Sequence, residues 1–249
     1  MPYRLLNPKV RNEPETVFVA ESEKIVRRLW ASSYRCDTLL VSDKKLPRIV
    51  DDIPIGVDVL VVSEETMKDV LGFKFHSGVM ATGVRRPYPT ASDWLATNPP
   101  PGVLLVLPEL TDPLNLGAIL RNAAAFGVTG VLFGPQCRDP FSRQSIRTSM
   151  GTIFSLPLCR SDDVVADLKI LRNAGYESWA TVLDESATPL PKAGRPERVA
   201  LLVGNEGPGL PPEVIAAADR RVTIEMSLGT DSLNVTAATA VFLYGLTRA

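Results

Sequence analysis

The chain has 249 residues, and its 27 Lys and Arg against 28 Asp and Glu give a formal net charge of -1. This balance excludes a polybasic chain that coats nucleic acid through charge alone, so any RNA would have to be bound by local patches. Cys36, Cys137 and Cys159 are far apart and form no C-x-x-C pair, which argues against a disulfide framework or a zinc site and fits a reducing cytoplasm. The sequence shows neither a membrane-length apolar run nor the h-region of a targeting signal, so we expect a cytoplasmic protein.

The first third of the sequence alternates short β-branched runs with helical patterns. An amphipathic helix is predicted over 22–31, and a further helix follows the candidate N-cap Ser63 and ends before Gly72. An extended run, GVMATGVRR, closes this part at Arg86. The predicted strands are 16–20, 38–42 and 57–63.

A proline-rich stretch, PYPTASDWLATNPPPG, separates this part from the rest of the chain. Its prolines disfavour both helix and central strand, so the stretch is predicted to be a linker. We therefore expect three segments: a small α/β domain over 1–86, a linker over 87–102 and a second domain over 103–249.

The second domain begins with an apolar strand at 103–110 and a helix that Asp112 caps, Pro113 opens and Gly127 ends. Further apolar runs are typical of strands buried on both faces in a parallel sheet, and they alternate with helices. The sequence thus predicts an α/β fold with a mostly parallel sheet and no internal repeat. These runs are 130–134, 179–183 and 199–204, with a helix over 162–175 before the second.

The segment NLGAILRNAAAFG places Asn115 and Arg121 at the start of the helix that follows the first strand. A guanidinium in this position can hold a phosphate or a carboxylate through two parallel hydrogen bonds. Taken alone, the segment is better explained by a turn-forming Asn115 and a solvated Arg121 on the helix surface than by a binding site.

The segment LLVGNEGPGLPPEVI runs from a buried strand into Gly204, Gly207 and Gly209. Such a loop lets the backbone approach a ligand closely, although a turn-rich connection would look similar. The glycine spacing is not that of a dinucleotide fingerprint, and the Lys-Ser/Thr of a P-loop is missing. Glu206 among three glycines is an unusual choice for a plain turn.

The segment TDSLNVTAATAVFLYG opens a helix near the C-terminus. Asp231 or Ser232 would serve as its N-cap. Asn234 is then expected in the first turn, where asparagine is a poor helix former, so we expect a polar partner for it.

These three segments together resemble the ordered motifs of the SpoU (TrmH-like) branch of the SPOUT RNA methyltransferases: Asn-x-Gly-x-x-x-Arg, Gly-x-Glu-Gly-x-Gly and Ser-Leu-Asn-Val. The segment RTSMGTIFSLP, 147–157, resembles the connecting segment of that family, and the first domain is similar to the L30e/L7Ae-like RNA-binding domain found in front of many members. One departure is Glu225, which stands where the family often has proline.

The resemblance implies transfer of a methyl group from S-adenosylmethionine to a ribose 2′-hydroxyl of RNA, by a homodimer whose C-terminal domain contains a deep trefoil knot. Ribosomal RNA is favoured over transfer RNA by analogy with the L30e-like domain. No metal is implied. The cofactor would lie against backbone groups at Val182, Leu183, Gly204, Asn205, Gly207, Ile224, Met226 and Leu233.

The implied catalytic residues are Asn115, Arg121, Glu206, Ser232 and Asn234. Because a guanidinium stays protonated in proteins, we expect Arg121 to grip the target phosphate and stabilise developing alkoxide charge rather than act as a base. Asn115, Ser232 and Asn234 would orient the ribose, and Glu206 would orient Arg121 or the cofactor amine. The single histidine, His76, lies in the first domain and is expected to be structural or to face RNA.

RNA contact requires basic patches, each of which could equally be a solvated face. The candidate patch residues are Lys24, Arg27, Arg28, Lys44, Lys45, Arg48, Arg85 and Arg86 in the first domain, and Arg138, Arg143 and Arg147 around Phe141.

Two alternatives to ribose methylation remain open: a catalytically silent RNA-binding adaptor of the same fold, and a methyltransferase acting on a base nitrogen.

Overall fold

The computed structural model describes residue 3, residues 16–228 and residues 231–248, and the other positions lie outside this description. The described residues form two compact units. Unit 1 runs to Pro87 and also includes 139–155, whereas unit 2 comprises 88–138 and the residues from 156 onward. Within the described residues, no helix has the length and apolar character that crossing a membrane requires.

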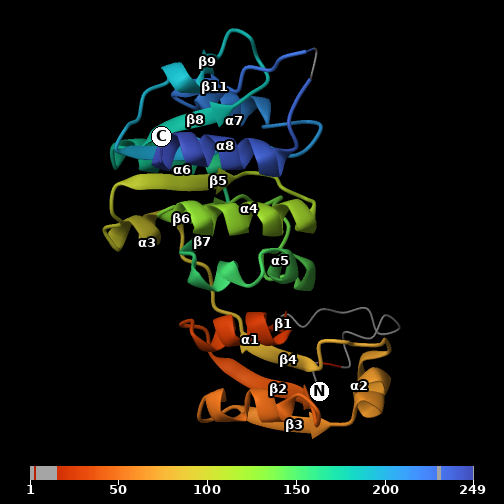
Figure 1. Ribbon diagram of the computed structural model, residues 1–249. Coiled ribbons are helices and arrows are strands. Elements are labelled where there is room, and N and C mark those ends of the chain that lie inside the picture. Colours follow the sequence, from red (N-terminus) through yellow and green to blue (C-terminus); the bar gives the residue numbers. More distant parts are fainter. Residues whose placement is uncertain (1–2, 4–15, 229–230, 249) are drawn as a thin grey trace. The chain divides into compact units, whose positions relative to one another are not determined.

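Unit 1 is built on a four-stranded mixed sheet in the order β1-β4-β2-β3 (Figure 1). Strand β4 is antiparallel to both its neighbours, and β2 is parallel to β3. The predicted strands and the helices predicted over 22–31 and after Ser63 are confirmed, with Ser63 capping α2 and Gly72 ending it in the left-handed conformation. The helical pattern expected after 38–42 forms only two short 3-10 turns, Leu46–Arg48 and Val50–Asp52. The bounds are β1 Val17–Glu21, β2 Cys36–Ser42, β3 Asp58–Val62, β4 Val79–Val84, α1 Glu23–Trp30 and α2 Glu64–Leu71.

Unit 2 contains a seven-stranded sheet in the order β7-β6-β5-β10-β8-β11-β9, and every neighbouring pair is parallel. This confirms the predicted α/β fold with a parallel sheet. Strands β7, β9 and β11 were not predicted, because they are only two to four residues long and, unlike the equally short β6, contain no continuous apolar run. The bounds are β5 Gly102–Leu107, β6 Gly130–Phe133, β7 Leu158–Arg160, β8 Glu177–Thr181, β9 Thr188–Pro189, β10 Arg198–Leu202 and β11 Arg220–Thr223.

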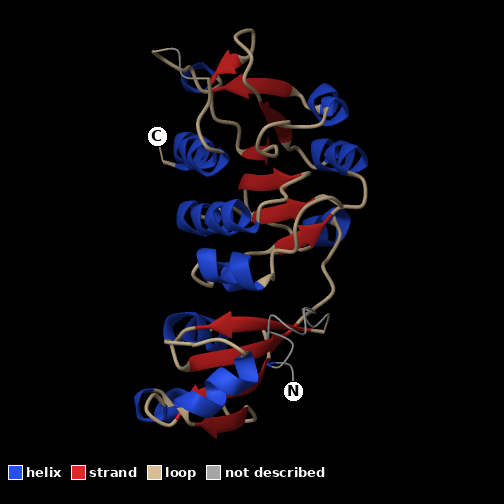
Figure 2. Cartoon of the chain, turned by 90° about the vertical axis from the view of Figure 1, so that its right-hand side faces the viewer, coloured by secondary structure: helices blue, strands red, loops and turns tan. Residues whose placement is uncertain are grey.

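Helices cover both faces of this sheet (Figure 2). Helices α3, α6 and α7 bury Trp94, Leu168 and Val214 against one face, in a cluster with Leu104 and Val106 of β5. Because side chains alternate along a strand, the intervening residues of β5 point to the opposite face, which α4 and α8 cover. The bounds are α3 Ala91–Ala96, α4 Pro113–Phe126, α6 Val164–Asn173, α7 Pro212–Ala217 and α8 Val235–Thr247.

The predicted linker contains a helix, so that part of the expectation is wrong. Thr90 and Asp93 form a reciprocal capping box at the start of α3. Trp94 is only 4% exposed and packs into the core of unit 2. The prolines of this stretch lie before the N-cap and after the helix, where they bound a helix without interrupting it.

Residues 139–155 lie within the predicted second domain but pack as part of unit 1. They contain α5, Arg143–Thr148, and a single 3-10 turn, Thr152–Ser155. The ring of Phe141 lies 4.8 Å from that of Phe18 on β1, and both side chains are buried. No local sequence pattern predicts this contact, because the two phenylalanines are more than 120 positions apart.

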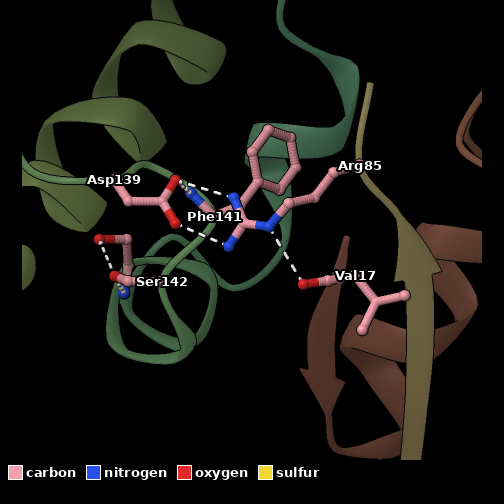
Figure 3. Close-up of polar contacts among 6 residues, drawn as sticks. Val17, Arg85, Asp139, Phe141 and Ser142 are labelled. Atoms are coloured by element: carbon pink, nitrogen blue, oxygen red, sulfur yellow. Dashed lines mark hydrogen bonds and ion pairs between the residues drawn. The ribbon is translucent and has the colours of Figure 1, made fainter. Parts of the chain in front are cut away.

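Two arginine–carboxylate pairs, Arg85–Asp139 and Arg143–Glu21, reinforce this aromatic contact and are called the clasp below. Figure 3 shows the first pair. The Arg85 guanidinium donates two hydrogen bonds to the Asp139 carboxylate, at 3.1 and 2.7 Å, and a third to the Val17 carbonyl at 3.0 Å. Arg143 forms an ion pair with Glu21, whose side chain is buried. Bidentate pairing and partial burial make such contacts stronger than exposed ion pairs.

We predict that Arg85→Met loosens residues 139–155 without unfolding unit 2. The substitution leaves the Asp139 carboxylate without its bidentate donor, and a hydrogen bond to a charged group contributes about 1.5–3 kcal/mol. Amide hydrogen exchange in 139–155 should therefore rise by roughly tenfold or more, while exchange in α4 stays unchanged. Arg86→Met, which removes a guanidinium lying 4.9 Å from the Tyr34 ring, is the control. Equal exchange in both variants would contradict a structural role for the clasp.

Candidate functional site

A cavity of about 720 Å³ opens in unit 2 where several parallel strands end. Its walls come from the residues after β8, the loop after β10, the residues after β11 and the start of α8. The carboxyl ends of parallel strands meet at one edge of a sheet, and ligands of open α/β folds bind outside that edge. The volume lies within the roughly 300–1,000 Å³ that is usual for small-molecule sites.

All the residues expected to contact the cofactor line this cavity. They come from segments up to about 50 positions apart, which the parallel pairing of β8 with β10 and β11 brings together. Glu225 is exposed and does not line the cavity, whereas its neighbours Ile224 and Met226 do. The lining residues from the expected set are Val182, Leu183, Gly204, Asn205, Gly207, Ile224, Met226 and Leu233.

The glycine-rich loop forms a tight turn over the cavity. Asn205 and Gly209 exchange two backbone hydrogen bonds, at 3.0 and 3.1 Å, which close the loop on itself. A Cβ atom at Gly204 would lie 2.3 Å from the Gly209 carbonyl carbon, so the loop can fold back only over a glycine. Gly207 has a φ of 81°, a left-handed conformation that favours glycine. The tight turn directs Glu206 to the cavity wall.

The first and second motifs meet through a hydrogen bond from the Asn115 side-chain amide to the Glu206 carboxylate. Asn115 is held in place because Asp112 caps α4, accepting hydrogen bonds from the backbone amides of Leu114 at 2.6 Å and Asn115 at 3.0 Å. Arg121, one of the two partners expected for Glu206, does not contact it within this chain. Glu206 instead binds the amide of the first motif.

The surroundings of Glu206 change the pKa of its side-chain carboxyl group. Desolvation in the loop, and after it the negative charge of Asp112, raises the pKa of Glu206 above the usual value of a glutamate. The carboxylate is therefore the group in this wall that takes up a proton most readily as the pH falls toward the acidic range.

Asn234 is the N-cap of α8 rather than a residue of its first turn, so the expected caps, Asp231 and Ser232, are wrong. The Asn234 Oδ1 atom accepts a hydrogen bond from the Thr236 backbone amide at 2.9 Å. This contact supplies the polar partner that the sequence required, and helix α8 begins at Val235. Ser232 and Asn234 both line the cavity.

Arg121 does not reach the cavity. It lies on the exposed stripe of α4, one heptad after Leu114, which is 48% exposed. No hydrogen-bond or ion-pair partner of Arg121 occurs among the described residues. Asn115 also stands outside the lining, although its partner Glu206 is part of it. The single chain therefore assembles four of the five expected catalytic residues at or against one cavity and leaves the fifth on an open helix face.

Sequence reasoning missed Thr236 and Asn122, which join α8 to α4. The Thr236 hydroxyl donates to the Asn115 Oδ1 atom, and the Asn122 amide donates to the Thr236 carbonyl. The spacing Asn234-x-Thr236 is typical of an N-cap and its bonded amide, and it could have identified the helix start. The apolar wall residues Leu210, Ile215 and Phe242 have no distinct sequence signal, because apolar residues of a cavity wall have the same sequence pattern as those of the core.

Several candidate RNA-binding arginines are engaged inside unit 1. Arg85 and Arg143 belong to the clasp described above, and Arg28 donates to the Met150 carbonyl at 2.6 Å. Phe141 is buried, so the expected aromatic centre of the second patch is a core residue. Lys24, Arg48 and Arg147 stay exposed, and the RNA-binding role of the remaining basic residues stays a prediction.

Residues 102–244 match the model of the SpoU rRNA methylase family, and the chain belongs to that family. It is 37% identical to an uncharacterized tRNA/rRNA methyltransferase of Mycobacterium tuberculosis, over 94% of this chain and 82% of the relative. It is 30% identical to the 23S rRNA (guanosine-2′-O-)-methyltransferase RlmB of Acinetobacter baylyi, over 83% and 85%. The crystal structure of the AdoMet-bound rRNA methyltransferase from Sinorhizobium meliloti is similar, with a TM-score of 0.81 and 27% identity over 98% of this chain and 92% of that one.

The chain is thus an RNA methyltransferase, and SpoU methyltransferases use S-adenosylmethionine. The cavity fits this cofactor. Apolar side chains such as Ile215 and Phe242 suit a purine ring, and the glycine-rich loop exposes backbone groups to a polar ligand. Among the described residues, no cluster of three His, Cys, Asp or Glu side chains is placed to hold a metal ion.

We predict that Asp112→Asn shifts the acid limb of the methyl-transfer pH profile to lower pH. Asp112 raises the pKa of Glu206, so removal of its charge lowers that pKa and keeps the carboxylate ionised further into the acid range. Asparagine still caps a helix, so α4 should persist.

The matched control for this prediction is Asp163→Asn, because Asp163 caps α6 in the same way and lies outside the cavity lining. Measuring kcat against pH for both variants tests the assignment. A limb that stays in place in Asp112→Asn, or moves to higher pH, would contradict it.

Proposed function

We propose that this protein transfers the methyl group of S-adenosylmethionine to a ribose 2′-hydroxyl of structured RNA, with ribosomal RNA favoured and transfer RNA the second candidate. The observation that carries the proposal is the convergence of the second and third motifs on one cavity, with Asn115 of the first motif bonded to Glu206 in its wall. The Acinetobacter relative is a 23S rRNA (guanosine-2′-O-)-methyltransferase, which supports the choice of ribose and of ribosomal RNA.

The bound cofactor supplies an activated methyl group on a sulfonium, so the protein has to align the target hydroxyl and favour charge on its oxygen. Ser232 and Asn234 present a hydroxyl and a side-chain amide at the cavity wall, where they can orient a ribose. Glu206 accepts from Asn115 and thereby fixes the direction of that amide. Arg121 grips the target phosphate, a role suited to a guanidinium without a partner among the described side chains.

The homodimer is part of the proposal, and the face that carries Arg121 supports it. Helices α4 and α8 pack side by side and expose apolar side chains: Leu114 is 48%, Val241 42% and Tyr244 56% exposed. A second copy covering this face would bring Arg121 of one chain toward the cavity of the other. Sedimentation of the purified chain at micromolar concentration tests this point, and a monomer alone would contradict it.

Two further features of the fold belong to the same proposal. The trefoil knot would be formed by the segments after β8, β10 and β11, and their convergence on one cavity supports it. Unit 1 would be an L30e-like RNA-binding domain, for which its small mixed sheet with flanking helices is suited. Unit 2, in which most of the family match lies, would form the methyltransferase domain.

Transfer of labelled methyl from S-adenosylmethionine to separated 16S, 23S and transfer RNA tests the reaction directly. We expect label on the ribose oxygen of one nucleotide, identified by digestion of the product. Label on a base nitrogen would replace the ribose assignment, and no label on any fraction, together with no cofactor binding, would favour the RNA-binding adaptor.

We predict that Arg121→Lys lowers kcat by about 100-fold or more while cofactor affinity changes less than twofold. Lysine keeps the charge but cannot form the two parallel hydrogen bonds of a guanidinium, and Arg121 lies outside the cavity lining. Single-turnover kinetics and calorimetric titration of the cofactor separate the two effects. Near-normal turnover of the lysine variant would overturn the bidentate grip on phosphate.

A further inference from the structure

Thr236, in the first turn of α8, contacts three asparagines through three different groups. Its backbone amide donates to the Asn234 side chain at 2.9 Å, its hydroxyl donates to Asn115 Oδ1 at 3.1 Å, and its carbonyl accepts from Asn122 Nδ2 at 3.0 Å. Asn115 and Asn122 lie two turns apart on the same face of α4. One residue therefore connects the third motif to the first.

Thr236 itself does not line the cavity. Its neighbour Val235 does, and so do Ala238 and Thr239 one turn further along the helix. The side chain is half-buried between α8 and α4, where its β-branched side chain has few rotamers available. Any effect of the hydroxyl on the reaction must therefore pass through the residues that it holds.

The hydroxyl decides how the Asn115 amide is used. A side-chain amide has one accepting and one donating end, and an ionised carboxylate can only accept. With Oδ1 engaged by the Thr236 hydroxyl, Nδ2 points at Glu206 in the cavity wall. Loss of the hydroxyl would leave a half-buried oxygen unpaired and free the amide to rotate away from Glu206.

We propose that Thr236 is a positioning residue for methyl transfer, with Asn122 as its support, and this inference rests on the proposed function. Thr236 holds the Asn115 amide toward Glu206 and keeps the Asn234 cap at the cavity wall, so that the groups expected to orient the ribose share one rigid arrangement. Asn122 fixes the Thr236 carbonyl and so maintains the relative placement of α8 and α4 at the site.

Thr236→Val, which is isosteric and lacks the hydroxyl, tests the proposal. We expect kcat with the RNA substrate to fall about tenfold or more, while the cofactor dissociation constant changes less than twofold. Thr236→Ser retains the hydroxyl and should recover most of the loss. Thr247→Val is the matched control, because Thr247 donates only to the Leu243 carbonyl near the other end of the same helix.

A second readout does not depend on catalysis. The side-chain amide resonances of Asn115, assigned by their absence in Asn115→Asp, should shift in Thr236→Val and stay close to wild type in Thr236→Ser. If Thr236→Val does not fold, Asn122→Ala, which removes only the support, should lower kcat about threefold with unchanged cofactor affinity.

The outcomes separate this inference from the proposed function. An active wild-type protein whose Thr236→Val variant keeps its kcat overturns the positioning role alone. Equal losses in the valine and serine variants, accompanied by a lowered Tm, also overturn it, because they indicate a packing role. A wild-type protein that transfers no methyl group overturns the proposed function, and the catalytic role of Thr236 with it.

Discussion

The parallel pairing of β10 with both β5 and β8 is the constraint on which the site depends. It places the carboxyl ends of these strands at one edge of the sheet, and β11 extends the same edge through its pairing with β8. Buried apolar side chains on both faces fix the register, because a one-residue slip would turn the inward faces of these strands around. The loops that leave the aligned strand ends can then only converge, and the cavity lies where they meet.

The polar groups beside the cavity include two carboxylates that repel each other. Glu206 is held near Asp112, and the repulsion between the two carboxylates is one cause of the raised pKa of Glu206. Asp112 is nevertheless useful there, because it caps α4 and so sets the position of Asn115. The Asn115 amide, which donates to Glu206, partly offsets the repulsion by stabilising the charged carboxylate. Helix capping and site chemistry are thus coupled through one acidic side chain.

Some basic residues of unit 1 stabilise its own packing, although the charge pattern alone would assign them to RNA binding. Arg85 and Arg143 pair with carboxylates and hold residues 139–155 against β1 and β4. This segment belongs by sequence to the region that matches the family and by packing to unit 1. The arginines that remain exposed are fewer than the sequence suggested, so under the proposed function this unit would have to recognise RNA more by shape and by a few contacts.

The sequence by itself determined the local structure and the chemistry of the motifs. Capping residues and terminal glycines predicted α2 and α4 with nearly their observed bounds, and β-branched runs predicted the long strands, because these signals act between near neighbours. The three motifs also indicated the family, which the comparisons confirmed. Helix α3 and the short strands were missed, since their stability comes from burial against distant segments rather than from propensity.

Only the tertiary structure decided how the motif residues are used. It made Asn234 the N-cap of α8, bonded Glu206 to Asn115 rather than Arg121, and left Arg121 on an open helix face. It also placed Phe141 in the core of unit 1 and joined Thr236 to Asn115 across 121 positions. These contacts depend on how helices and strands pack, which involves long-range geometry. Residue types and local spacing determine which groups are available, and packing determines which of them meet.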